Sequence, residues 1–303
     1  MEANSASRMP HVHKDSRVTG WLVPRNMRSL VGRVLTYGAL LVAFVAFVGP
    51  IYWIFITAVK PKEQLFVMPP AFWPREFVWR NFYHVFFELA PYPTYFLNTF
   101  KIAFLNVVGR TLSAALVAYG FTVGEFRGRE VWFSILLATM MVPRQVTLIP
   151  LFVLFSRVGW VNTILPLSVP GFFGGGAYYI FLLRQFFLSI PDELAEAARM
   201  DGASTLRTWW NIYLPNSVPA LTAVAVFCFM NAWNDYFGGL IYLQKRSAWT
   251  VTVGLAGMRQ NMNVMDYNTQ MAGAFMISIP CVVVFFLAQR YFTEGVTMSG
   301  VKG

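Results

Sequence analysis

The chain has 303 residues, of which 56% are hydrophobic and only 13% are charged, and its formal net charge is +10. Soluble domains carry about 25% charged residues, so this composition argues against a water-soluble fold and favours a chain that is largely surrounded by lipid. The basic residues are spread through loops without interleaved aromatic side chains, so we expect no nucleic-acid partner. Cys228 and Cys281 lie in apolar stretches, which predicts packing rather than a metal site.

Six stretches of the chain approach the roughly 20 mostly apolar residues that a membrane-spanning helix needs. In chain order, the predicted spans are residues 34–58, 95–120, 131–155, 163–187, 216–243 and 270–292. The second of them is interrupted by Lys101, Asn106 and Arg110. The sequence therefore predicts an all-α, polytopic membrane protein whose transmembrane domain covers residues 34–303.

The first 33 residues are polar and basic, and no short apolar core with a small-residue cleavage site precedes Val34. We therefore expect residues 1–33 to be a tail and the first span to be uncleaved. With this tail inside the cell, 13 basic residues fall on cytoplasmic segments and eight on external ones. This excess follows the positive-inside rule, and six spans then place both termini in the cytoplasm.

The external segment, residues 60–93, is rich in proline and aromatic residues. Such a composition predicts an ordered loop at the membrane interface rather than a helix. The segment is either a connector or a surface that meets an external partner, and the sequence favours neither interpretation.

Polar residues within the later spans are candidates for a solute pathway. Pro143 predicts a kink in the third span, which leaves Gln145 near the membrane interior. Asn231, Asn234 and Asp235 lie in the second half of the fifth span. An ionisable residue in a span is costly and usually faces a cavity or a partner helix. The alternative role for these three residues is hydrogen bonding between helices.

Two basic residues in the second span have no assigned role from the sequence. Lys101 and Arg110 either extend toward the interface or pair with Asp235. The pattern of the sequence does not distinguish these possibilities.

The most polar internal stretch, residues 190–215, lies between the fourth and fifth predicted spans. Pro191 is favoured at a first helical position, and Gly202 permits the positive φ that ends a helix. A second helical run from about Ser204 ends at Pro215. We expect a cytoplasmic helix–turn–helix whose first helix, mostly alanine, fits a groove of another protein. The alternative is an ordinary amphipathic loop.

The spacing within this stretch resembles the EAA loop of bacterial ABC importer permeases. The pattern is Glu-Ala-Ala, three residues, Gly, nine residues, Ile, one residue and Leu-Pro, and every spacing is met. The matching residues are Glu196, Ala197, Ala198, Gly202, Ile212, Leu214 and Pro215, with Asp201 directly before the glycine. We call residues 190–215 the EAA loop.

Other segments are similar to the carbohydrate-uptake branch of that family. They include Asp201-Gly202-Ala203-Ser204, Trp233-Asn234-Asp235-Tyr236 and the run from Val142 to Leu151. The C-terminal end, from Gln289 to Gly303, is similar to MalG-like permeases. The resemblance covers the chain from about residue 30 to its end and implies the MetI-like, MalG-like importer permease fold.

The resemblance also implies a division of labour in the inner membrane. A MalG-like subunit pairs with a second, MalF-like permease, two copies of a cytoplasmic ABC ATPase and an external sugar-binding protein, and it is embedded in membrane lipid. ATP and Mg²⁺ belong to the ATPase, so we expect no cofactor, no metal site and no enzymatic activity in this chain. The expected function is translocation of a sugar or sugar derivative.

The resemblance assigns two contacts with the ATPase. The EAA loop forms a coupling helix in a cleft of the ATPase, where Glu196 can meet an arginine. The C-terminal residues Val301, Lys302 and Gly303 reach toward the ATPase dimer. The loop after the second span departs from the family pattern, because it carries Glu125 and Glu130 where relatives are basic.

Three alternatives remain at this point. An ion-coupled secondary transporter needs embedded acids, for which only Asp235 is a candidate. A membrane enzyme needs clustered catalytic side chains, and the three histidines are not clustered with them. An ABC permease for a non-sugar solute is also compatible with the EAA loop. The run Gly174-Gly175-Gly176 lacks the Lys-Ser/Thr of an ATP-binding loop.

Overall fold

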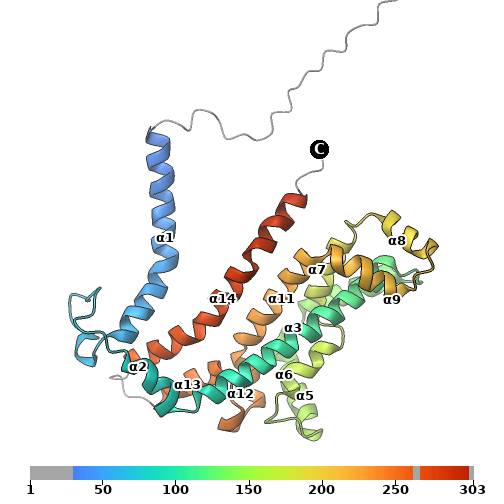
Figure 1. The fold of residues 1–303 in the computed structure, drawn as a ribbon. Helices are drawn as coiled ribbons and strands as arrows, with labels where there is room; N and C mark the ends of the chain where they lie inside the picture. The colour runs from blue at the N-terminus through green and yellow to red at the C-terminus, as the bar shows by residue number, and fades with distance from the viewer. Residues whose placement is uncertain (1–29, 262–266, 300–303) are drawn as a thin grey trace, which may run out of the picture. The chain divides into compact units, whose positions relative to one another are not determined.

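The computed structural model describes residues 30–261 and 267–299, and every regular element within these ranges is a helix (Figure 1). The chain divides into two units, residues 1–52 and residues 53–303. In the first unit, the described residues form most of helix α1 (Leu30–Val59), whose side chains up to Tyr52 are almost all exposed. An apolar helix with this much exposed surface is suited to lipid rather than water.

The second unit is built around the 32-residue helix α3 (Tyr92–Val123), which packs against both α7 and α11. Its other α-helices are α2 (Arg80–Tyr83), α4 (Arg129–Ala138), α5 (Arg144–Arg157), α6 (Leu165–Ser168), α7 (Ala177–Phe187), α8 (Asp192–Met200), α9 (Thr205–Thr208), α10 (Leu214–Asn216), α11 (Val218–Trp233), α12 (Tyr236–Tyr242), α13 (Val251–Asn261) and α14 (Tyr267–Ser299). Short 3-10 or π turns join them: η2 (Lys62–Gln64), η3 (His84–Leu89), η4 (Thr139–Met141), η5 (Val169–Phe172), η6 (Trp209–Tyr213) and η7 (Arg246–Ala248).

Among the described residues, four helices are long and apolar enough to cross a membrane, and the number rises to six if each of two bent pairs is one span. The first pair bends by 93° between Met141 and Arg144, so the kink predicted at Pro143 is confirmed. The second pair bends by 84° between Asn216 and Val218. The all-helical, polytopic prediction is therefore confirmed.

Two predicted spans are less regular than the sequence suggested. The fourth is interrupted by Gly174, Gly175 and Gly176, whose φ angles are 89°, 68° and 122°. The fifth is not one helix over residues 216–243, because α11 ends at Trp233 and Asp235 caps the separate helix α12. At the second break the Asp235 carboxylate accepts from the Gly238 N–H and pairs with Arg144 of α5.

The segment of residues 60–93, predicted to be external, is only partly a loop. Residues 80–89 are helical, as α2 and η3, which corrects the expectation of a non-helical segment. The remainder is ordered by side-chain hydrogen bonds, since the Gln64 amide donates to the Trp73 carbonyl at 2.9 Å. Lys60 donates to the Ala71 carbonyl, and its burial lowers the pKa of its ammonium group.

Arg184 of α7 joins α4 and the end of α3. The Arg184 guanidinium lies 2.8 Å from the Glu130 carboxylate and 4.1 Å above the Phe133 ring. It also donates to the Phe121 carbonyl at the end of α3. The acid at position 130, in the first turn of α4, therefore has a partner within this chain.

Candidate functional site

The EAA loop has the two helices that the sequence predicts, α8 and the run α9–η6–α10 (Figure 1). Gly202 ends α8 with φ of +77°. Its N–H donates to the Arg199 carbonyl at 3.0 Å, and the Ala203 N–H donates to the Ala198 carbonyl at 2.9 Å. This pair of bonds is the Schellman arrangement, which requires the left-handed conformation that glycine adopts most readily. The predicted role of Gly202 in the backbone is confirmed.

The helix boundaries of the EAA loop differ from the prediction by one or two residues. Pro191 is the N-cap of α8 rather than its first helical residue. Ser204 caps α9, accepting from the Arg207 N–H at 3.4 Å. The second helix continues past Pro215 to Asn216, because a proline near the start of a helical turn gives up an N–H that need not be bonded there.

One face of the EAA loop is anchored in the core. Tyr213 is only 1% exposed, and its ring packs edge-to-face on Tyr119 of α3 and Phe187 of α7. Ala195 of α8 and Trp209 join the same buried cluster. The EAA loop therefore cannot move without carrying α3 and α7 with it, since close-packed cores transmit displacement.

The rest of the EAA loop is exposed and carries large apolar side chains among charged ones. Met200 is 88% exposed and Trp210 is 59% exposed, and Leu194 and Leu206 are exposed as well. Glu196 of α8 is exposed as well. Large exposed apolar side chains with a polar surround are typical of a surface that another protein covers.

The predicted EAA residues divide between the two faces. Ala198, Ile212 and Leu214 are partly buried, whereas the others are exposed: Glu196, Ala197, Asp201, Gly202 and Pro215. The predicted contact residues Val301, Lys302 and Gly303 lie outside the described residues.

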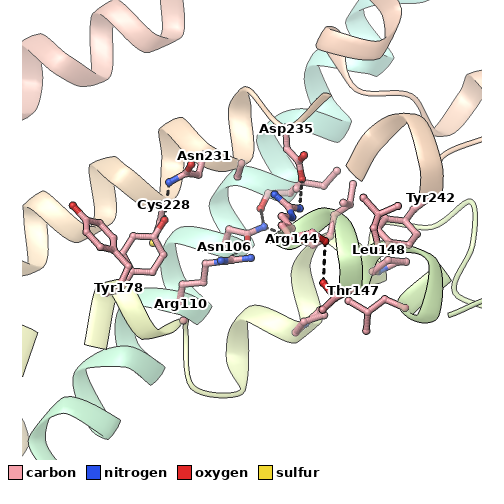
Figure 2. A pocket seen from close by; sticks show the side chains of 18 of the residues that line it. Asn106, Arg110, Arg144, Thr147, Leu148, Tyr178, Cys228, Asn231, Asp235 and Tyr242 are labelled. Atoms are coloured by element: carbon pink, nitrogen blue, oxygen red, sulfur yellow. Dashed lines mark hydrogen bonds and ion pairs between the residues drawn. The ribbon is translucent and has the colours of Figure 1, made fainter. Parts of the chain in front are cut away.

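A second candidate region is a cavity of about 530 Å³ within the second unit, which we call the central cavity (Figure 2). Its walls come from α3, η4, α5, α6, η5, α7, α11 and α12. Its polar lining side chains include Asn106, Arg110, Arg144, Thr147, Tyr178, Tyr179, Asn231 and Asp235.

An ion pair between α5 and the start of α12 forms one wall of the central cavity. The Arg144 Nη2 atom lies 2.8 Å from an oxygen of Asp235, whose other oxygen accepts from the Gly238 N–H. The side chain of Asp235 is 16% exposed and that of Arg144 is 68% exposed. Asp235 is thus fixed from both sides, while Arg144 lines the cavity with most of its side chain exposed.

Arg110 and Asn106 form the facing wall, one helical turn apart on α3 (Figure 2). The Asn106 amide donates to the Leu167 carbonyl at 2.7 Å, and its oxygen accepts from Arg110 Nε at 2.6 Å. The α3 residues 102, 106 and 110 line the cavity, as expected from the four-residue spacing of one helix face.

Aromatic and amide groups complete the cavity. Asn231 of α11 donates to the Tyr179 hydroxyl of α7 at 2.8 Å. Tyr178 lies edge-to-face on Tyr179 and is partly exposed. Asn231 therefore lines the cavity and also forms a hydrogen bond between α11 and α7. The two roles considered for it, pathway lining and interhelical hydrogen bonding, are both present.

The structure brings only two of the four predicted pathway residues to the central cavity. Asn231 and Asp235 line it, whereas Gln145 and Asn234 do not belong to its wall. Asn234 instead donates to the Met230 carbonyl of its own helix. Asp235 pairs with Arg144, not with Lys101 or Arg110, because the kink at Pro143 brings α5 to it.

Sequence reasoning missed the cavity positions of Asn106, Arg144, Tyr178 and Tyr179. The signal for the first was present, because Asn106 and Arg110 are four residues apart on one predicted helix. The contact between Arg144 and Asp235 joins residues 91 positions apart, and no local pattern marks such a pair.

The family described as "Binding-protein-dependent transport system inner membrane component" matches residues 111–298. The arabinooligosaccharides transport system permease protein AraQ of Halalkalibacterium halodurans is 32% identical, over 92% of this chain and 99% of that protein. The sn-glycerol-3-phosphate transport system permease protein UgpE of Yersinia pestis is also 32% identical, over 88% of this chain and 94% of that protein.

A solved structure has the same fold. It is a bacterial ABC transporter involved in the import of the acidic polysaccharide alginate, and one of its chains is similar with a TM-score of 0.77 and 24% identity. The match covers 89% of this chain and 99% of that chain. The similarity to known proteins therefore includes the arrangement of the helices in space as well as the sequence.

Proposed function

The chain belongs to the family of binding-protein-dependent transport system inner membrane components, and from this membership we propose that it is a permease subunit of a sugar importer. The relatives named for arabinooligosaccharides and sn-glycerol-3-phosphate support a sugar or sugar derivative as the solute. The proposed assembly contains a second, MalF-like permease, an external sugar-binding protein and two copies of a cytoplasmic ATPase that hold ATP and Mg²⁺.

The proposed coupling role rests on the contrast between the buried face and the exposed face of the EAA loop. Tyr213 and Ala195 fix one face to α3 and α7, while Met200 and Trp210 leave the other face without a cover in the described chain. An element that transmits motion from one protein to another needs both a packed face and an exposed face. Its inner face must be rigid, and its outer face must bind the element that moves.

The proposed mechanism follows from these contacts. ATP-driven closure of the ATPase pair moves the groove that holds α8, and the EAA loop transmits the displacement through Ala195 and Tyr213 to α3 and α7. Both helices line the central cavity through Arg110 and Tyr179, so the displacement changes the shape of the cavity. Solute delivered by the binding protein then passes through the membrane.

The position of the termini is part of the same proposal. The EAA loop lies on the cytoplasmic side if it contacts the ATPase, and the basic N-terminal tail is then also cytoplasmic. The C-terminal residues Val301, Lys302 and Gly303 are proposed to contact the ATPase dimer, on the strength of the family resemblance alone.

Uptake by the reconstituted transporter tests the proposal. The chain is assembled in proteoliposomes with the second permease and the ATPase, and the binding protein is added outside with a radiolabelled oligosaccharide. We expect uptake that requires ATP and the binding protein and is inhibited by vanadate. Uptake driven by a proton or sodium gradient without ATP would contradict the ABC assignment, and ATP-dependent uptake of only non-sugar solutes would contradict the solute class.

A further inference from the structure

We propose that the central cavity accepts the negatively charged group of an acidic sugar, with Arg110 and Arg144 as its binding residues. The proposal rests on the proposed function as a sugar permease and specifies its solute class. The chemical class is a sugar that carries a carboxylate or a phosphate ester.

The charge of the described cavity wall is positive. Its charged residues are Arg110, Arg144 and Asp235. Asp235 is already bound to Arg144 Nη2 and to the Gly238 N–H. One positive charge is therefore not neutralised within the wall. In a membrane such a charge is costly unless it faces water or an anion, and confined space with little water strengthens its attraction for an anion.

Arg110 is held in place by close backbone contacts rather than by an acid. A side-chain carbon at Gly171 would lie 2.8 Å from Arg110 Cγ, and one at Gly175 would lie 2.4 Å from the Arg110 carbonyl oxygen. Ser113 reinforces this contact by donating to the Gly171 carbonyl at 2.9 Å. The glycines thus let η5 and the turn before α7 close over the stem of Arg110.

The guanidinium of Arg110 keeps donors for a ligand. Its Nε donates to Asn106, and its two terminal nitrogens have no acceptor among the described residues. These nitrogens have the parallel geometry that binds a carboxylate or phosphate with two hydrogen bonds. An arginine whose inner nitrogen is fixed and whose outer nitrogens are unpaired is arranged to bind an anion.

Arg144 supplies a second cation on the facing wall. Asp235 holds one of its terminal nitrogens, so the planar group is oriented while its other nitrogens remain exposed to the cavity. Figure 2 shows Arg110, Asn106 and Arg144 directed toward a common space. An anion between the two walls therefore meets donors from both.

The remaining wall suits the neutral part of a sugar. Tyr178 and Tyr179 provide aromatic surface, and Asn231 and Thr147 provide amide and hydroxyl groups. Binding sites commonly combine apolar and aromatic surface with a few fixed polar groups. The cavity thus places aromatic and neutral polar groups beside the two arginines.

Protection of a cysteine in the cavity wall measures binding directly. Thr147→Cys is introduced after Cys228→Ser and Cys281→Ser, and the transporter is assembled with its second permease and ATPase in zwitterionic lipid nanodiscs. The labelling rate with neutral N-ethylmaleimide is measured against trigalacturonate, sn-glycerol-3-phosphate and neutral arabinotriose. We expect an anionic solute to halve the rate at a concentration at least about tenfold lower than arabinotriose, since a charge-assisted bond contributes this much.

Substitutions of the two arginines test whether they cause the preference for an anionic solute. Arg110→Gln should remove most of the tenfold preference, and Arg144→Gln together with Asp235→Asn should reduce it in part. Lys101→Met is the matched control, because it removes a cation from an exposed position of α3 that is not in the cavity wall, and it should leave the preference unchanged.

Each outcome has a defined meaning. Protection by trigalacturonate alone assigns a carboxylate, protection by the phosphate ester alone assigns a phosphate, and protection by both assigns charge as the common feature. Equal protection by arabinotriose overturns the proposal, as does a preference that survives Arg110→Gln. Protection without added solute in phosphatidylglycerol nanodiscs would identify a lipid headgroup as the ligand and would also overturn it.

The same preparation separates this proposal from the proposed function. Stimulation of ATP hydrolysis by the binding protein reports coupling, whatever the charge of the solute. Stimulated hydrolysis with no anion preference contradicts the acidic-sugar inference alone. Absence of stimulation with every candidate binding protein of the assembly contradicts the permease assignment itself.

Discussion

The EAA loop and the central cavity are built in opposite ways. The EAA loop is one continuous stretch of residues 190–215, held by apolar packing on one face and exposed on the other. The cavity gathers polar side chains from helices far apart in the chain, each fixed by one or two hydrogen bonds. The first region is suited to transmitting force, and the second to selecting what passes.

This difference predicts two kinds of mutational effect. Changes in the EAA loop should act through packing and backbone conformation, and they should affect coupling for every solute alike. Changes in the cavity should act through charge, and they should affect one class of solute more than another. The substitutions below are chosen to separate these effects.

The largest effect is expected for Tyr213→Ala. Removing a buried aromatic ring leaves a cavity between α3, α7 and the EAA loop, which costs about 3–5 kcal/mol of stability. Thermal unfolding of the purified subunit in detergent should shift to clearly lower temperature. Trp210→Ala removes an exposed ring from the same loop, and it should leave the unfolding temperature nearly unchanged while reducing co-purification of the ATPase. Equal destabilisation by both variants would refute the two-sided description of the loop.

The next effect is expected for Gly202→Ala. The left-handed φ at this residue strains any side chain by about 1–2 kcal/mol, although the space around it is open. We expect reduced uptake with normal membrane insertion, and a larger loss for Gly202→Asp. Gly159→Ala is the matched control, since Gly159 has φ of +71° and open space but lies outside the EAA loop. A similar loss of uptake in both alanine variants would show that backbone strain, rather than the site, is responsible.

The smallest effect is expected for Glu196→Lys. An exposed charge contributes less than about 1 kcal/mol to an ion pair, so ATPase affinity in a pull-down titration should fall a few-fold. Glu125→Lys makes the same charge change at an exposed position outside the EAA loop and should leave the affinity unaffected. A stronger effect at position 125 would move the ATPase contact to the loop after α3.

The comparison also explains what the sequence could predict. The EAA loop depends on local rules, such as the glycine that ends α8 and the prolines at 191 and 215, and these rules placed both helices to within two residues. The apolar runs predicted the long helices α1, α3 and α14 for the same reason. The predicted extent of the tail and transmembrane domain, and the orientation in the membrane, remain predictions.

The cavity could be predicted only in part, because it depends on how helices meet. Asp235 was recognised as unusual, but its partner Arg144 is placed by the bend at Pro143 and by the break after α11. Arg110 was placed on α3 but not in the cavity, since the contact with Gly171 and Gly175 has no local signature. Long-range polar contacts therefore limit the prediction of a site more than helix formation does.

Photo-crosslinking from the EAA loop tests the central claim most directly. Ala197→Cys, in the background of Cys228→Ser and Cys281→Ser, is labelled with benzophenone maleimide in the assembled, transport-active complex. The account predicts a crosslink to the ATPase at this exposed position of α8, and none from Gly159→Cys. An active complex in which Ala197→Cys is labelled but never crosslinks to the ATPase would contradict the assignment of the EAA loop as the coupling element.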